Sequence, residues 1–440
     1  MKSQNLAVCG GDPVRKTPFP AYKVLGSEEK EAVNQVLESA ILSRFLGSWH
    51  PDFYGGPFVQ KFEQDWAKSC NAEFAVSMNS NTSGLYSAIG AAGIQFGDEV
   101  IVSPYTMCAS ATAPLIFNGV PVFADIDPET HCITAETIRS KISARTKAII
   151  VVHLFGQVAD MEPIMKLANE YGLIVIEDCA QAPFAKYNGK NVGTIGHMGV
   201  FSLNYHKHIH TGEGGVVTTN DEQLADRLQL IRNHAEAVVE KKGVQNLINM
   251  IGFNFRMGEM EAAIGIEQLK KGPQLIRERV DNVKVIEAGL SALPGLLMPA
   301  DINGMDNVFY VHSLRYDANI TGVSRDKVVT ALKAELPVTD LREGEGPLVG
   351  QGYVRPLYFM PIFQTPHLIF GKQSAIAKAV KSCQVSYQIG CCPQSEHAHF
   401  SSLITHELMR PGMTKNDLSD VVLAFHKVWE NLSSLKSLVI

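Results

Sequence analysis

Between residues 73 and 220, short apolar runs alternate with longer stretches of helical periodicity. A continuous apolar run indicates a strand buried on both faces, and its regular alternation with helices is typical of a mostly parallel sheet in an α/β fold. We interpret seven runs as strands, over residues 74–78, 100–103, 120–124, 148–153, 173–177, 199–203 and 216–219. Helices are expected between them, over residues 83–92, 108–117 and 161–170. Ligands of such folds bind at the carboxyl ends of the strands, so functional residues are expected there.

The sequence predicts a change of domain near Gly272. Residues 259–271 have helical spacing without proline, and Gly272 followed by Pro273 is a typical helix stop. A second, charged helix is expected over residues 274–292, and the remainder mixes a strand (309–316) with helices (325–335 and 418–429). We therefore expect a large N-terminal domain over residues 1–272 and a smaller C-terminal domain over residues 273–440, with residues 343–361 as an ordered loop over the sheet.

The composition excludes several classes of function. The 440 residues include 39 Lys and Arg against 45 Asp and Glu, a formal charge of −6 with no long basic run, so nucleic-acid binding is not expected. The N-terminus lacks the apolar core of a secretory signal, and no stretch approaches the ~18 apolar residues of a membrane span. The eight cysteines form no Cys-x-x-Cys pair. We expect a cytoplasmic protein with mostly buried free thiols.

Asp178 follows a predicted buried strand in the segment LIVIEDCAQA. An ionised carboxylate at a buried strand end is costly unless a cation or several donors meet it. One interpretation is a cap for the next helix. The other is a partner for a cationic ring nitrogen, such as that of pyridoxal 5′-phosphate (PLP), whose protonated pyridine stabilises a carbanion. Gln181 would then reach a neighbouring ring substituent, or it is simply a surface polar residue.

Lys207 follows the next predicted strand and is surrounded in sequence by His206, His208 and His210. Burial in such surroundings would lower the pKa of its amine, as a Schiff-base lysine requires, whereas a solvated side chain is the alternative. The alternating histidines could also indicate a metal site. Only Glu213 lies close by as a further ligand, so no metal is expected.

Two further segments have weaker signals. Residues 79–84 join the first strand to a helix, and their small polar side chains and N–H groups suit a phosphate, although any helix N-cap looks similar. Residues 252–258 place Asn254 and Arg256 in an otherwise apolar loop. Alone, this second segment indicates little.

In this order and spacing, the segments resemble the DegT/DnrJ/StrS family of PLP-dependent sugar aminotransferases. The resemblance covers nearly the whole chain, from SEEKEAVNQVL through GDEVIVSPYTMCASA, VPVFADIDPET, VVHLFGQVADM, VIEDCAQA and FSLNYHKHIHTGEGG to NFRMGEMEAAIGIEQL. It implies the aspartate-aminotransferase fold (fold type I). That fold has a large, mostly parallel seven-stranded sheet sandwiched by helices, plus a smaller C-terminal α+β domain.

The resemblance also implies a role for each residue of the site. Lys207 would be the Schiff-base lysine, Asp178 the partner of the pyridine nitrogen, and Gln181 a contact on the ring hydroxyl side. The phosphate would be held by Ser202, by Thr82 and by the backbone of Asn81 and Ser83. The family's match to Asn254 reaches the phosphate from the neighbouring subunit, which implies a homodimer with shared active sites.

Three positions depart from the family pattern. Met107 stands where an aromatic residue usually stacks on the cofactor ring, and a thioether contact is a weaker substitute. Asn81 stands where a small residue or glycine usually precedes Thr82, and Ala-Pro-Phe follows Gln181 in place of the commoner Ala-His-Gly. The details of the phosphate loop and of the substrate wall are therefore expected to differ.

The implied activity is transfer of an amino group from an amino acid to a keto-sugar. L-Glutamate is the expected donor, and a nucleotide-linked keto-sugar is the expected acceptor. Members that act as dehydratases have histidine at the position of Lys207, so transamination is favoured over dehydration. The segments GGDPVRKTPFP and GYVRPLYFMPIFQ resemble branches that include cyclitol (inosose) aminotransferases. A cyclitol or another polyhydroxy ketone is thus the alternative acceptor, and a binding module without catalysis is a further alternative.

Overall fold

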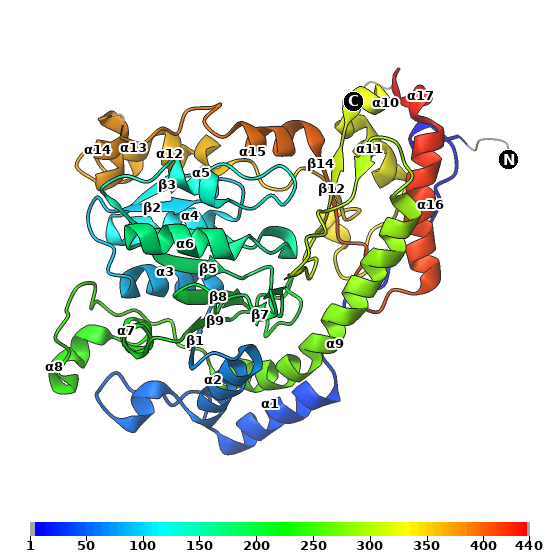
Figure 1. Ribbon diagram of the computed structural model, residues 1–440. Helices are drawn as coiled ribbons and strands as arrows, with labels where there is room; N and C mark the ends of the chain where they lie inside the picture. The colour runs from blue at the N-terminus through cyan, green and yellow to red at the C-terminus, as the bar shows by residue number, and fades with distance from the viewer. Residues whose placement is uncertain (1–4, 383, 438–440) are drawn as a thin grey trace.

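The protein is described here from a computed structural model that covers residues 5–382 and 384–437. A seven-stranded sheet forms the centre of the large domain, in the order β1-β9-β8-β5-β4-β2-β3 (Figure 1). Its strands are β1 Phe74–Met78, β2 Glu99–Val102, β3 Val120–Phe123, β4 Thr146–Val152, β5 Ile174–Asp178, β8 Met198–Ser202 and β9 Gly215–Thr219. Only β9 runs antiparallel to its neighbours. The predicted seven-stranded, mostly parallel sheet is confirmed.

Buried strands and covering helices explain why the apolar runs predicted this sheet. Every residue of β2, β8 and β9 is buried, as expected for strands covered on both faces. Figure 1 shows α6 crossing in front of the sheet, with further helices above and below. The helices of this domain are α2 Pro57–Cys70, α3 Asn81–Ala91, α4 Cys108–Thr112, α5 Ala135–Arg139, α6 Met161–Tyr171, α7 Glu222–Arg232 and α8 Val239–Lys242.

A second domain is built on a smaller antiparallel sheet, in the order β10-β12-β14-β13. Its strands are β10 Leu296–Leu297, β12 His312–Tyr316, β13 Val349–Gln351 and β14 Leu403–His406. Helices α11 Arg325–Glu335 and α16 Lys415–Glu430 pack around it, and Leu6 and Phe19 from the start of the chain belong to the same core. The remaining short helices are α10 Ala318–Thr321, α12 Pro361–Gln364, α13 Pro366–Ile369, α14 Ala375–Lys381, α15 Pro393–His397 and α17 Leu432–Leu435.

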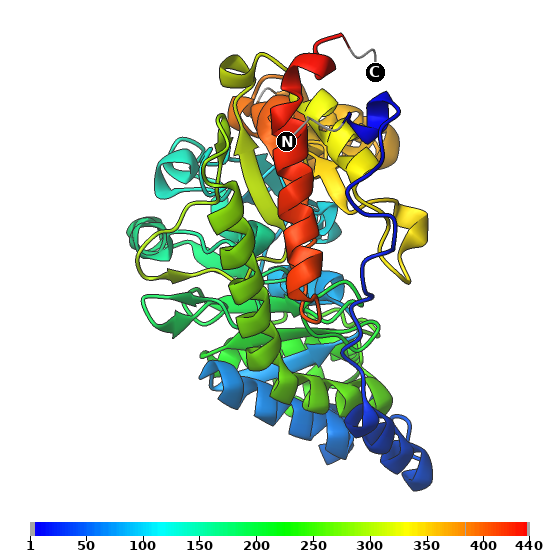
Figure 2. The ribbon, with the colours of Figure 1, turned by 90° about the vertical axis from the view of Figure 1, so that its right-hand side faces the viewer.

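The predicted helix stop at Gly272–Pro273 is wrong. A single helix of 32 residues, α9 Glu259–Leu290, runs through it with Pro273 inside. Proline removes one helical hydrogen bond and crowds the preceding turn, which bends a helix rather than always ending it. Here tertiary packing outweighs the local signal, because the first half of α9 packs on α1 Ser27–Ser39 and α2 and the second half on α16. Figures 1 and 2 show α9 joining the two domains, so the domain boundary near Gly272 stays a prediction.

Residues 343–361 are ordered, as expected, but they also contribute β13 to the second sheet. After β13 the segment returns to the large domain, where the Tyr353 N–H donates to Tyr105 Oη at 2.9 Å. A third, three-stranded sheet joins β6 Lys186–Tyr187 and β7 Lys190–Asn191 to β11 Met305–Asp306. It too connects the two domains.

The described cysteines are all free thiols, and four of them are buried. Cys383 lies outside the described residues. Within the described part of the chain, no helix is both long and apolar enough to cross a membrane.

Candidate active site

Asp178 is the last residue of β5, at the carboxyl end of the sheet. Its buried carboxylate accepts hydrogen bonds from Ser110 Oγ at 2.7 Å and from the Ala180 N–H at 3.1 Å, and Asn81 Nδ2 lies 3.5 Å away. The bond from Ala180 closes a local turn, and because the next element is strand β6, the interpretation of Asp178 as a cap for the next helix is wrong. Among residues 5–382 and 384–437, no side-chain cation lies within ion-pair distance of this carboxylate. A buried negative charge therefore faces the site with only neutral donors around it.

Lys207 comes from the loop after β8 and reaches the same end of the sheet. Its Nζ atom lies 4.1 Å from the centroid of the Tyr310 ring. Burial lowers the pKa of this amine to about 8, and the nearby carboxylates of Asp178 and Glu407 partly oppose that shift. The lowered pKa expected from the sequence is confirmed. A substantial fraction of the amine is therefore neutral near physiological pH.

The three histidines around Lys207 contact different neighbours. His208 is buried, with Nε2 3.0 Å from the carbonyl oxygen of Val308. His206 packs against Tyr205 with ring centroids 3.7 Å apart, and His210 Nδ1 accepts a hydrogen bond from the Gly212 N–H. They do not converge on a common point.

Gln181 is buried below the site, with both ends of its amide engaged. Its Oε1 accepts a 2.6 Å hydrogen bond from the Phe155 N–H, and its Nε2 donates to Tyr353 Oη at 3.0 Å. Tyr353 belongs to the segment that follows β13. Gln181 thus fixes a tyrosine of the segment after β13 against the large domain, and its contact with a ring hydroxyl stays a prediction.

The predicted phosphate residues gather at the start of α3. Ser80 caps this helix and accepts from the Ser83 N–H at 3.0 Å, so the N–H groups of Asn81 and Thr82 are left in the first turn. Ser202 pairs with Gly215 in the β8–β9 register. A Cβ on Gly215 would lie 2.7 Å from the Asn81 nitrogen, so Gly215 and its neighbour Ser202 lie against the helix start. A helix start with unpaired N–H groups and a hydroxyl suits an anion.

The side chain of Asn81 has a contact that the sequence did not indicate. Its Nδ2 donates to the carbonyl oxygen of Val200 at 3.3 Å and lies 3.5 Å from Asp178 Oδ1. The residue that departs from the family pattern is therefore directed toward Asp178. The Asn81 amide is therefore a third neutral donor beside the Asp178 carboxylate.

Met107 and Asn254 lie at the exposed margin. Met107 precedes α4, the helix that supplies Ser110, and its side chain is 58% exposed. Asn254 is exposed as well, and its carbonyl oxygen accepts from Asn79 Nδ2 at 3.4 Å. Asn254 thus lies beside the loop before α3 of its own chain. Stacking by Met107 and a role for Asn254 across a dimer stay predictions.

Three residues that lie around Lys207 and Asp178 were not predicted as site residues from the sequence. Ser110 is one of several small residues in α4 and has no distinguishing signal. Tyr310 and Glu407 belong to the second domain, far from Lys207 in sequence, and Glu407 pairs there with Arg342 at 3.0 Å and with Arg410. Only the tertiary fold brings these residues to the catalytic end of the sheet.

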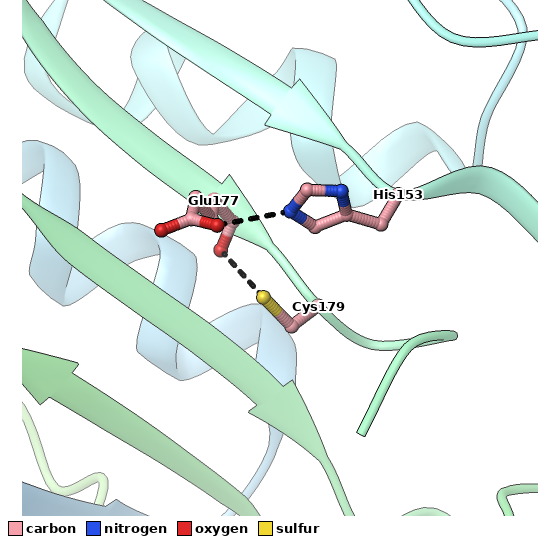
Figure 3. Close-up of side chains that lie close together, drawn as sticks. All are labelled: His153, Glu177 and Cys179. Carbon is pink, nitrogen blue, oxygen red and sulfur yellow. Dashed lines mark hydrogen bonds and ion pairs between the residues drawn. The ribbon is translucent and has the colours of Figure 1, made fainter. Parts of the chain in front are cut away.

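Behind Asp178, the neighbouring residues Glu177 and Cys179 are buried beside His153 (Figure 3). Their potential ligand atoms lie within 4.8 Å of one another. His153 Nδ1 accepts from the Ala159 N–H, which leaves Nε2–H to donate to Glu177 Oε2 at 3.0 Å. Glu177 also accepts from the backbone N–H groups of Gly193, Ile195 and Gly196.

This cluster is better explained as a structural network than as a metal site. The two oxygens of Glu177 are already satisfied by these four donors, and burial raises the pKa of the Cys179 thiol well above its usual value. A protonated thiol is a poor metal ligand. The network instead fixes the end of β5, and with it the position of Asp178.

Comparison with known proteins identifies the family to which this chain is similar. Residues 25–357 match the DegT/DnrJ/EryC1/StrS aminotransferase family. The GDP-perosamine synthase of Escherichia coli O157:H7 is 38% identical over 62% of this chain and 72% of its own length. The L-glutamine:2-deoxy-scyllo-inosose aminotransferase of Streptomyces lividus is 35% identical over 77% of this chain and 80% of its own length. The solved aminotransferase structure from Psychrobacter cryohalolentis is 28% identical, with a TM-score of 0.80, and covers 94% of this chain and 100% of that chain.

Proposed function

This chain belongs to the DegT/DnrJ/EryC1/StrS aminotransferase family, and on that premise we propose that it transfers an amino group from an amino acid to the keto carbon of a polyhydroxylated ring, with PLP as cofactor. The family resemblance read from the sequence is confirmed, and the protein is an aminotransferase. The observation that carries the proposal is that Asp178 and Lys207 lie at the same end of the sheet, close enough for the carboxylate to raise the pKa of the amine. Neither has an ion-pair partner among the described residues.

The site residues fit this cofactor. PLP would supply a protonated pyridine ring that stabilises negative charge on the donor carbon. Asp178 would hold the proton on the ring nitrogen, since its buried carboxylate lacks a cation. Lys207 would bond to the aldehyde carbon through its partly neutral amine. The N–H groups at the start of α3, with Ser202, would bind the phosphate.

Lys207 is also the group placed to move the proton of the reaction. With a pKa of about 8, its Nζ can accept the proton that leaves the donor Cα and return one later in the cycle. The Tyr310 ring covers one side of Nζ and excludes water from it. The net reaction converts an amino acid and a ketone into a 2-oxo acid and a primary amine.

We propose a nucleotide-linked keto-sugar as the acceptor and L-glutamate as the donor. The similarity to a GDP-perosamine synthase supports this choice. A cyclitol ketone is the second candidate, because the similarity to the L-glutamine:2-deoxy-scyllo-inosose aminotransferase extends over more of the chain, 77% against 62%. That relative also makes L-glutamine a second candidate for the donor.

The proposal includes a homodimer with shared sites. Large apolar side chains are exposed in two adjacent segments of the large domain, namely Leu37, Ile41, Leu42, Leu46 and Trp49 with Leu247, Ile248 and Ile251. The segments are adjacent because Lys242 Nζ lies over the Trp49 ring and Asn233 Nδ2 donates to the Leu46 carbonyl. Exposed apolar clusters of this kind favour contact with another protein surface.

The direct test is amine transfer with purified enzyme and PLP. Each donor, L-glutamate and L-glutamine, is assayed with a panel of keto-sugar nucleotides and with scyllo-inosose, and the amine product is identified by mass spectrometry. The donor alone should also bleach the visible absorbance of the bound cofactor. No spectral change with any amino acid would contradict the proposal, and amination of scyllo-inosose alone would favour the cyclitol acceptor.

A further inference from the structure

A cavity of about 820 Å³ lies where the second half of α9 meets the segment before β12. Its walls come from α9, from residues 299–309, and from the region of β6 and β7. The volume is within the ~300–1,000 Å³ range of small-molecule sites, which favour domain junctions. None of the predicted site residues lines it, so it is separate from the active site.

A single segment of chain separates this cavity from the active site. Val308 and Phe309 line the cavity. The carbonyl oxygen of Val308 lies 3.0 Å from Nε2 of His208, the residue after Lys207. The next residue in the segment, Tyr310, covers Lys207 Nζ. A molecule in the cavity would therefore contact the segment that positions the surroundings of Lys207.

This segment is held in an uncommon backbone conformation. Phe309 has a φ of 49°, in the left-handed region that non-glycine residues seldom occupy. Its carbonyl oxygen accepts a 3.1 Å hydrogen bond from Nη1 of the buried Arg279. Backbone strain of this kind persists only where the surrounding contacts enforce it, so a ligand against one face of the segment can change the position of its residues.

One of the cations that line the cavity has an ion-pair partner within the same lining. Lys284 forms a 3.6 Å ion pair with Asp281 on α9. Lys186 lies opposite Asp306 in the β6–β11 register. The third cation of the lining is Arg277, which lies on α9 ten residues before Glu287.

Two carboxylates, those of Glu287 and Asp301, also line the cavity. Burial and the charge of Asp301 raise the pKa of Glu287 to about 7. Two neighbouring carboxylates that repel each other form a place where a cation is favoured.

Among the described residues, the side chain that contacts the Glu287 carboxylate is a neutral histidine. His312 Nε2 lies 3.2 Å from Glu287 Oε1, and His312 Nδ1 lies 2.8 Å from His406 Nε2. Because His406 Nδ1 accepts from the Leu408 N–H, the protons are directed from His406 to His312 and on to Glu287. Burial lowers the pKa of His312 to about 3 and that of His406 well below its usual value. Within the described chain, the two carboxylates thus have no cationic partner at ion-pair distance.

We propose that this cavity binds a polyhydroxylated primary amine, with its ammonium group between Glu287 and Asp301, and that the bound amine alters the active site through residues 308–310. Asn191 lines the same cavity, and its Oδ1 can accept a hydrogen bond from a hydroxyl group, while Phe184 and Phe309 offer apolar surface to the ring. If the proposed function holds, the reaction product is an amine of this class. Product bound in the cavity would then alter the surroundings of the catalytic lysine.

The experiment measures amine binding without turnover. Holoenzyme is reduced with borohydride to block the lysine and is titrated at pH 8 with D-glucosamine and with scyllo-inosamine, with scyllo-inositol as the uncharged control, by calorimetry. We expect one site per chain for at least one of the amines and no binding of scyllo-inositol. Glu287→Gln and Asp301→Asn should each weaken binding by about tenfold or more, equivalent to about 1.4 kcal/mol. Glu278→Gln, which removes a carboxylate of α9 outside the cavity lining, should leave binding unchanged.

A second measurement tests the link to the active site. The amine should lower kcat without raising the KM of the donor, and Asp301→Asn should remove this inhibition. Failure of both amines to bind, equal binding to the Glu287→Gln and Asp301→Asn proteins, or equal binding of scyllo-inositol would overturn the inference. Because Asp301 is exposed, its variant keeps the test decisive if Glu287→Gln fails to fold. Amine binding by a protein that aminates no ketone would instead count against the proposed function alone.

Discussion

The amine of Lys207 lies over the ring of Tyr310, with Nζ 4.1 Å from the ring centroid. Lys207 belongs to the large domain, and Tyr310 to the segment that enters the second domain. The face of a tyrosine ring attracts an ammonium ion, whereas burial disfavours it. Burial lowers the pKa of Lys207 to about 8, against the opposing effect of the Asp178 and Glu407 carboxylates. The reactivity of the lysine thus depends on both domains.

Replacing Lys207 by alanine should abolish transamination and covalent attachment of the cofactor. The reason is that no other described lysine is placed against Asp178 at the carboxyl end of the sheet. Borohydride reduction followed by intact-mass measurement should show the added cofactor in the parent protein and not in Lys207→Ala. A retained adduct in the variant would assign the attachment to a different residue.

Asp178→Asn should keep the shape of the site and remove its charge. We expect kcat to fall by about a hundredfold or more, as when an oriented electrostatic group is lost at a reacting centre. Ser110→Ala is the matched control, because it removes only the 2.7 Å bond to Asp178. It should raise the activation free energy by about 1 kcal/mol. Steady-state kinetics on both variants give the comparison. Equal losses of kcat in the two variants would show that the negative charge of Asp178 contributes little to the rate.

Substitutions at two neighbours of Lys207 should shift the pKa of its amine in opposite directions. Since the carboxylate of Glu407 raises the pKa of Lys207, Glu407→Gln should lower it further below about 8. Tyr310→Ala should raise it toward its ordinary value, because the exposed amine regains water. The rate at which apoenzyme captures PLP, followed by absorbance against pH, reports the neutral fraction. Midpoints that shift together in both variants would contradict this account.

Sharing of the site between subunits can be tested by mixing. Asn254→Ala and Lys207→Ala proteins should each be weakly active or inactive. Mixed dimers should recover activity, because one of their two sites combines an intact Lys207 with an intact Asn254. Mass spectrometry confirms that mixed dimers formed. If such dimers stay inactive, each site is built from a single chain and Asn254 acts on the loop beside it.

The parts of this molecule that were predictable from sequence are those with a local cause. The strands at residues 74–78 and 216–219 were predictable because most of their residues are buried. Asp178 ends the buried strand β5, and Lys207 comes five residues after the buried strand β8 ends. Ser110 and Tyr310 could not be found in this way, since their contacts with the site depend on packing between distant segments. Helix α9 was mispredicted for the same reason, because contacts along both halves outweigh the local effect of Pro273.

A substitution at Gly272 tests this explanation of α9. Alanine is a better helix former than glycine by about 1 kcal/mol, so local propensity alone predicts that Gly272→Ala stabilises the protein. However, a Cβ at this position would lie 2.3 Å from the Phe184 ring, which forces the ring or the helix to move. We therefore expect a net loss of about 1–3 kcal/mol in the free energy of unfolding, measured by urea denaturation. The loss should be smaller when Gly272→Ala is made in a Phe184→Leu background than in the parent. A stabilised Gly272→Ala protein would show that the close approach of Phe184 is not what requires glycine here.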